Sequence, residues 1–203
     1  MVCDRVDAIM IWFLYLPLDI VTSLLAFPLA PIIALFADGN GDVTLSKNNP
    51  LRLWLTPDNP IEGDRGHYER WADFVAKHPK IGLYVQRTFW LWRNKAYGWS
   101  WNVLNTWVYK DDKLYSCGNP KTGDKPYYSG VWAATTSKNP FKARWMLYIV
   151  FPSFPGKCFR LYLGWKFQSA LKMRIAHDAD PAAEISDYNA MFVSTINPFK
   201  TRR

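Results

Sequence analysis

The stretch AIMIWFLYLPLDIVTSLLAFPLAPIIALFA, residues 8–37, is the strongest structural signal in this chain. It holds a single charged side chain, Asp19, among its 30 residues. A helix needs about 20 mostly apolar residues to cross the hydrocarbon core of a bilayer. Residues 20–37 supply 18 uncharged residues in a row, which is just enough. The stretch therefore predicts an N-terminal segment that associates with a membrane.

Three prolines, at positions 17, 28 and 31, interrupt this segment. Proline removes a helical hydrogen bond and tends to bend the axis. Three arrangements follow: one kinked helix that spans, a helix broken at Pro17–Asp19 whose second part re-enters or lies in the interface, or a buried helix of a soluble protein. A carboxylate in lipid is costly, so we expect Asp19 at an interface, as an N-cap after the break and not as a proton relay.

Charge is divided unevenly along the chain. Residues 1–47 hold two basic and five acidic residues, a net of −3, and the remainder holds 23 basic and 12 acidic residues, a net of +11. Asp4 and Asp7 surround Arg5 where a signal peptide would carry a positive cluster, which argues against cleavage. The basic excess and the three cysteines predict a C-terminal domain in the cytoplasm.

We expect two domains, a hydrophobic anchor with its turn at residues 1–48 and a basic, aromatic-rich domain at residues 49–203. Apolar side chains recur at helical spacing in residues 65–78 and again in residues 80–92, which predicts two short amphipathic helices. Gly98 stands where a glycine would end the second helix.

Beyond residue 105 the pattern changes to short runs rich in β-branched and aromatic residues. The predicted strands are residues 106–109, 114–117, 127–136, 144–151 and 158–167, with the first two forming a hairpin. A short helix is expected at residues 181–188. The fold class is α+β: a membrane-associated helix or helices, two amphipathic helices, and an antiparallel sheet of about four or five strands.

Asp38, Asn40 and Asp42 stand at positions 1, 3 and 5 of a pattern that resembles a calcium-binding loop. The pattern fails where its geometry is strict, because Val43 replaces the required glycine and Asn49 replaces the bidentate glutamate. A turn rich in Gly, Asn and Asp explains the same residues. These three side chains remain the candidates for a metal site.

Asp58, Asp64 and His67 are the candidates for catalysis, because carboxylates beside a histidine can hold Mg²⁺ or Zn²⁺. They match no standard spacing of a metal site, a nucleophile elbow or a phosphate loop. Acidic residues next to prolines ordinarily cap helices or close turns. We therefore expect no cofactor, and an enzyme stays an alternative.

A run of aromatic and basic residues follows, here called the belt: Trp90, Trp92, Arg93, Lys95, Tyr97 and Trp99. Trp and Tyr favour the headgroup zone of a bilayer, and Lys and Arg attract anionic lipid. The belt is therefore a candidate membrane-interface or binding surface. An aromatic core with a basic rim explains it equally well. Interspersed acidic residues and the tether do not favour nucleic acid as a partner.

The motifs TPDNPIEGD at residues 56–64 and WLWRNKAYG at residues 90–98 resemble a family of small uncharacterised proteins of tailed bacteriophages and prophages. The resemblance extends over most of the chain. Lys95 stands where relatives tend to have proline. The resemblance implies a phage origin and hence the host inner membrane, but no activity.

These observations predict a phage-encoded, membrane-anchored accessory protein that acts by binding. Its partners would be host inner-membrane lipids and a protein of the host membrane, of a lysis or entry complex, or of a defence system. A metal-dependent hydrolase or nuclease built on Asp58, Asp64 and His67 is one alternative. A virion component involved in genome delivery is the other.

Overall fold

The structure is a computed structural model that describes residues 3–124, 127–136 and 144–201. These residues form an α+β fold in two compact units, each described here by itself. One unit combines Met1–Leu16 with Leu104–Arg203, and the other is Pro17–Val103. The units therefore divide the chain differently from the boundary at residues 48 and 49 that composition suggested. Helix α1 (Cys3–Ala34) contributes to both units.

Helix α1 is continuous and contains all three prolines. Of the arrangements left open, the single helix is confirmed and the break at Pro17–Asp19 is wrong, and so is the N-cap role of Asp19. This carboxylate lies within the helix, is 9% exposed, and accepts a hydrogen bond of 3.4 Å from the Ser100 hydroxyl. Each proline removes one backbone donor, but both halves of the helix pack against a unit. Tertiary packing of this kind supplies most helical stability in proteins.

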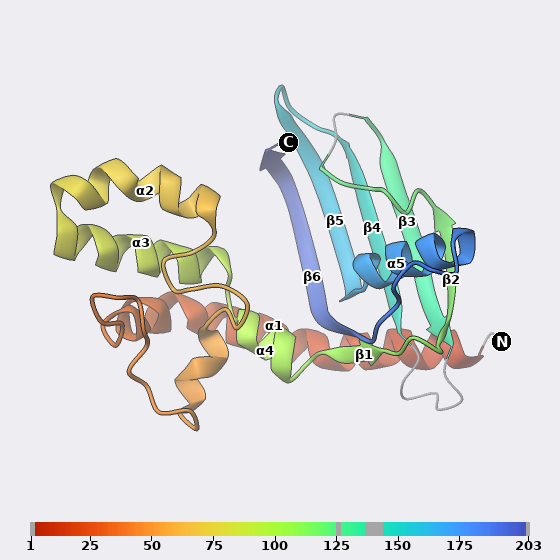
Figure 1. Ribbon diagram of the computed structural model, residues 1–203, viewed down its shortest axis with the longest axis horizontal. Helices are drawn as coiled ribbons and strands as arrows, with labels where there is room; N and C mark the ends of the chain where they lie inside the picture. The colour runs from red at the N-terminus through yellow and green to blue at the C-terminus, as the bar shows by residue number, and fades with distance from the viewer. Residues whose placement is uncertain (1–2, 125–126, 137–143, 202–203) are drawn as a thin grey trace. The chain divides into compact units, whose positions relative to one another are not determined.

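The sheet belongs to the unit of Met1–Leu16 and Leu104–Arg203. Within the described residues it has six antiparallel strands in the order β1-β6-β5-β4-β3-β2, with α5 (Gln168–Ala179) lying across it (Figure 1). The strands are β1 (Thr106–Val108), β2 (Lys113–Gly118), β3 (Ser129–Thr136), β4 (Trp145–Pro152), β5 (Lys157–Lys166) and β6 (Tyr188–Thr201).

Five predicted strands are confirmed, but their pairing and their number are not. The hairpin expected between the first two is wrong, because β1 pairs with β6 and β2 pairs with β3. The sixth strand, β6, was missed, and the helix expected at residues 181–188 is replaced by α5 further upstream. The sequence of β6 does not predict a strand, because it contains Pro198 and several Ser, Thr and Asn residues. Its extended conformation is stabilised by hydrogen bonds to β5 and β1.

The core of this unit is aromatic and covers both sides of β5. Tyr162 and Trp165 point to opposite faces of the sheet, yet they are only 7% and 0% exposed. Tyr162 stacks on Tyr148 at 4.5 Å between ring centroids. From α1, Trp12 stacks on Phe192 at 5.9 Å and donates its indole N–H to the Val193 carbonyl at 3.1 Å.

The unit Pro17–Val103 is helical. It holds the 3₁₀ helix η1 (Pro50–Trp54) and helices α2 (Arg65–Lys77), α3 (Pro79–Arg93) and α4 (Tyr97–Asn102). The two predicted amphipathic helices are confirmed as α2 and α3, which fold back on each other at His78 (Figure 1). The core packs Ala26, Ala30 and Ile33 of α1 against large side chains that include Trp54, Trp90 and Leu91.

Gly98 does not end a helix as expected, because it lies inside α4. A Cβ atom at this position would stand 2.7 Å from the Leu53 carbonyl oxygen, too close for any other residue without a shift. Gly98 is therefore required by the approach of α4 to η1.

Candidate functional site

Helix α1 differs from an ordinary surface helix because its exposed side is apolar. Three of its polar side chains, Trp12, Asp19 and Thr22, are at most 9% exposed. Its large apolar side chains, here called the outer face, are 39 to 72% exposed: Ile9, Met10, Phe13, Leu14, Leu18, Ile20, Val21, Leu24, Leu25, Phe27 and Ile32.

The apolar part of α1, Ala8–Ala34, is 27 residues long and apolar enough to cross a membrane. Only 17% of its most apolar window is buried within the chain. The core helix of a soluble protein would be mostly buried, and soluble monomers rarely expose apolar patches of this extent. The outer face is therefore a candidate contact surface.

The inner side of α1 is bound to its own units by indole donors. In the helical unit, Trp54 donates its indole N–H to the Thr22 carbonyl at 2.9 Å, and the Thr22 hydroxyl donates to the Leu18 carbonyl at 2.9 Å. In the sheet unit, Trp12 donates to the Val193 carbonyl. The hydrogen-bonding groups of these α1 side chains are thus turned toward protein, away from the outer face.

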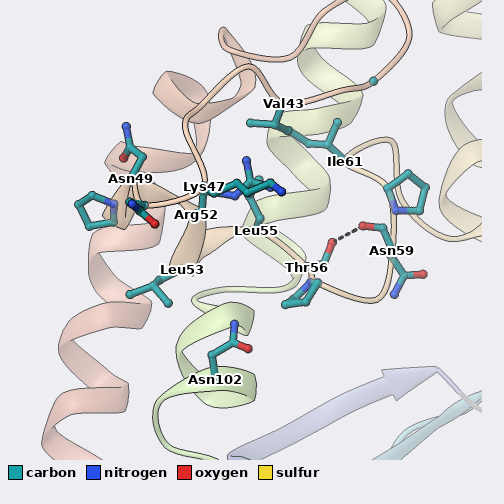
Figure 2. Close-up of a pocket in the computed structure, with 15 residues that line it drawn as sticks. Val43, Lys47, Asn49, Arg52, Leu53, Leu55, Thr56, Asn59, Ile61 and Asn102 are labelled. Atoms are coloured by element: carbon teal, nitrogen blue, oxygen red, sulfur yellow. Dashed lines mark hydrogen bonds between the residues drawn. The ribbon is translucent and has the colours of Figure 1, made fainter.

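A pocket of about 720 Å³ opens in the helical unit, between residues 41–61 and Asn102 (Figure 2). Its apolar wall includes Val43, Leu55 and Ile61, and its polar rim carries cations and amides: Lys47, Arg52, Asn48, Asn49, Asn59 and Asn102. Among the described residues that line it, none carries a carboxylate, so the pocket offers donors and positive charge but no acid–base pair.

Several polar groups of the pocket already have local partners. Arg52 donates to the Leu45 carbonyl at 2.8 Å, and Asn49 caps η1 by accepting the Leu51 N–H at 2.9 Å. The Thr56 hydroxyl donates to the Asn59 carbonyl and accepts the Trp90 indole N–H, at 3.1 and 2.9 Å (Figure 2). These bonds stabilise the loop that forms the pocket, and they explain most of its polar side chains without a ligand.

Arg87 is the buried ion-pairing centre of the helical unit, and sequence reasoning missed it. Its side chain is 5% exposed and donates to the Glu62 carboxylate at 2.6 Å. It also donates to the carbonyls of Ala37 and Asp38, at 3.1 and 2.7 Å. Gly41 lies against the same carboxylate. No local spacing links these residues, so no sequence signal marked the network.

His67 is buried beneath this network. Its Nε2 lies 2.9 Å from the Gln86 carbonyl and must donate to it, while the Gln86 amide donates to the Glu62 carbonyl at 2.9 Å. Burial lowers the pKa of His67 below its ordinary 6.5, and the nearby charges of Arg93 and Arg70 lower it further. The imidazole is therefore neutral at pH 7 and serves as a structural donor.

The candidate catalytic residues each have a structural partner. Asp58 accepts the Tyr97 hydroxyl at 2.8 Å. Asp64 caps α2 through the His67 N–H at 2.8 Å and pairs with Arg93 at 3.2 Å. Burial alone would raise the pKa of Asp64, but these two contacts outweigh it and lower the pKa. Among the residues that the structure describes, no three His, Cys, Asp or Glu side chains gather as a metal site would require.

The predicted calcium loop is a closed turn in the structure. The Asp38 carboxylate accepts the backbone N–H groups of Asn40 and Asp42, at 2.8 and 3.0 Å. A β-bridge between Ala37 and Val43 closes the turn from outside. The carboxylate proposed as the first metal ligand thus stabilises its own backbone.

The belt divides between core and surface. Trp90 is 2% exposed and Trp99 packs edge-on against Trp54 at 5.6 Å, so both belong to the core. Arg93 lies over the Trp90 ring at 5.3 Å, and Tyr97 stacks on Trp101 at 5.7 Å. Trp92, which also packs partly buried against this core, and Lys95 lie beside Phe27 of the outer face, with the Lys95 Nζ 5.6 Å from the centre of that ring.

Comparison with known sequences assigns residues 4–203 to the model of a family of unknown function (DUF7338). No curated protein and no solved structure matches the chain.

Proposed function

Since the chain belongs to this family of unknown function, no activity comes with the family, and we propose from the geometry that it is a membrane-associated protein that acts by binding. One observation carries the proposal. The outer face of α1 is apolar and exposed, while its single described charged side chain, Asp19, is buried together with Trp12 and Thr22. Water disfavours this arrangement, and lipid favours it.

The outer face is large enough to hold the protein at a bilayer. Burying one large apolar side chain contributes about 1.5–3 kcal/mol, and roughly half of that when the side chain is already half-buried. Eleven such side chains are available on α1. A single acyl chain gives a protein only marginal attachment to a membrane. The outer face offers several times the apolar area of one acyl chain.

The finer parts of the proposal draw on the sequence. The motifs at residues 56–64 and 90–98 support a phage or prophage origin, which makes the host inner membrane the target. The free Cys117, which is exposed, suits the reducing cytoplasmic side of that membrane. The bound protein partner would be a component of that membrane or of a complex assembled on it.

Flotation of the full-length protein with vesicles tests the proposal. We expect the wild type to float with phosphatidylcholine–phosphatidylglycerol vesicles, and to fractionate with membranes when it is expressed at low level. Val21→Glu and Leu24→Glu together should abolish flotation, because they place two charges on the outer face without touching the core. The matched control is Ile175→Glu on α5, also an exposed apolar position. A wild type that stays soluble in both assays overturns the proposal.

A further inference from the structure

The aromatic side chains of the helical unit form a continuous row that begins on α1, here called the ladder: Phe27, Trp92, Phe89, Trp71 and Phe74. Successive ring centroids lie 6.5, 5.1, 5.0 and 6.0 Å apart. Phe27, Phe89 and Phe74 are 47, 45 and 38% exposed. The ladder therefore extends the outer face of α1 onto α3 and α2.

A membrane-spanning α1 is hard to reconcile with the packing of its other side. The apolar part of α1 is about 40 Å long at 1.5 Å per residue, compared with about 30 Å for the hydrocarbon core. Within the helical unit, Ala26, Ala30 and Ile33 of α1 are covered by the core of that unit. A spanning helix would draw the helical unit into the hydrocarbon along with it.

The helical unit carries charges that the hydrocarbon would reject. The Glu62–Arg87 and Asp64–Arg93 ion pairs both belong to this unit. Charged side chains within a bilayer are costly even when they are paired. Covering on one side and exposure on the other is the arrangement of a helix that lies in the plane of the interface.

Resting on the proposed function, we infer that the part of α1 in the helical unit, residues 17–34, lies lengthwise in one leaflet of a phospholipid bilayer, and that the ladder enters the same lipid surface. The occupant of this surface is lipid because the outer face presents only aliphatic and aromatic side chains and one methionine thioether. Trp92 and Lys95 flank Phe27, as residues of a headgroup zone do, and the net charge of +8 complements anionic headgroups.

Depth measurement distinguishes the in-plane helix from a spanning one. Val21 and Ile32 lie eleven residues apart on α1, which is about 16 Å along the axis and about three whole turns, and both are exposed. Each is replaced by cysteine in a Cys3→Ser, Cys117→Ser background and labelled with a nitroxide. Power-saturation EPR in phosphatidylcholine–phosphatidylglycerol vesicles then gives the depth of each label. Equal depths within a few ångströms are expected, and depths that differ by about 10 Å or more overturn the inference.

The ladder is tested by vesicle partitioning of Phe89→Gln. Replacing an exposed phenylalanine that enters lipid should lower the partition coefficient roughly tenfold. Ile175→Gln, which removes an exposed apolar side chain from α5, is the matched control and should leave the coefficient unchanged. If Phe89→Gln and Ile175→Gln partition equally, the ladder does not belong to the surface that contacts lipid. A wild type that binds no vesicles overturns the proposed function itself. The label depths and the partitioning of Phe89→Gln, in contrast, test only how the bound protein is oriented.

Discussion

Trp92 donates its indole N–H to the carbonyl of Phe27 at 2.9 Å, and this carbonyl is the one that Pro31 deprives of a helical donor. In an α-helix the oxygen of residue 27 would accept from the N–H of residue 31, which proline lacks. A side chain 65 positions away in sequence replaces it. This contact helps to explain why α1 continues through a proline at which a sequence pattern predicts a bend.

The first prediction is a coupling between these two positions. Trp92→Phe should lower the free energy of unfolding by about 1 kcal/mol, because the Phe27 carbonyl loses its donor. In a Pro31→Ala background the helix supplies its own N–H, so the hydrogen-bond part of that loss should disappear. Denaturant unfolding followed by circular dichroism gives the double-mutant cycle. An equal cost of Trp92→Phe in both backgrounds would show that the indole N–H does not replace the missing donor.

A second prediction concerns the buried Arg87. Arg87→Leu should destabilise the protein by about 3–5 kcal/mol, because the buried Glu62 carboxylate loses its ion-pair partner and the Ala37 and Asp38 carbonyls each lose one hydrogen bond. The exposed pair Arg65–Glu69 provides the control, since its side chains are 92 and 60% exposed. Arg65→Leu should change stability by less than about 1 kcal/mol in urea unfolding. Similar costs for the two variants would contradict a structural role of the buried pair.

Gly41 supplies a third prediction. Its φ is +85°, and a Cβ atom there would meet the Glu62 carboxylate, so Gly41→Ala should cost about 2 kcal/mol or more. Gly39 lies in the same turn, and no atom of the described residues lies within 4 Å of the place that its Cβ atom would take. Gly39→Ala should therefore change the unfolding free energy by less than about 1 kcal/mol. Thermal unfolding of the two variants is the measurement, and equal melting temperatures would contradict this account of Gly41.

The fourth prediction is a pH dependence that arises from His67. Its pKa is lowered in the folded protein, so the unfolded chain binds more protons as the pH falls below 6.5. Stability from this group should therefore be complete above pH 6.5 and decline as the solution is acidified toward the folded pKa. Unfolding free energies on either side of this pH measure the slope. In His67→Gln the slope should become shallower, and an unchanged slope would assign it to other groups.

Local features of the fold were predictable where neighbouring residues decide the structure. The apolar periodicity of α2 and α3 and the aromatic runs of β4 and β5 identify these elements without tertiary information. The pairing of the strands was harder to predict from the sequence. Short sequence separation favoured a hairpin of β1 and β2, but β1 pairs with β6, which lies far along the chain.

The candidate site was only partly visible from sequence. The apolar stretch at residues 8–37 stood out because hydrophobicity is a local property. The roles of Asp58, Asp64 and His67 did not, because each depends on a partner elsewhere: Tyr97, Arg93 and Gln86. A carboxylate that caps a helix and one that binds a metal look the same in a sequence.

The amino-acid sequence by itself determines that residues 8–37 form an apolar segment and that the rest of the chain is basic and aromatic. Only the tertiary structure decides which side of α1 is exposed and which is covered. The reason is physical: almost every side chain on this helix is apolar, so its own pattern holds little directional information. The direction comes from Trp12, Trp54 and Trp92, whose indole donors attach residues distant in sequence to one another and leave the outer face free.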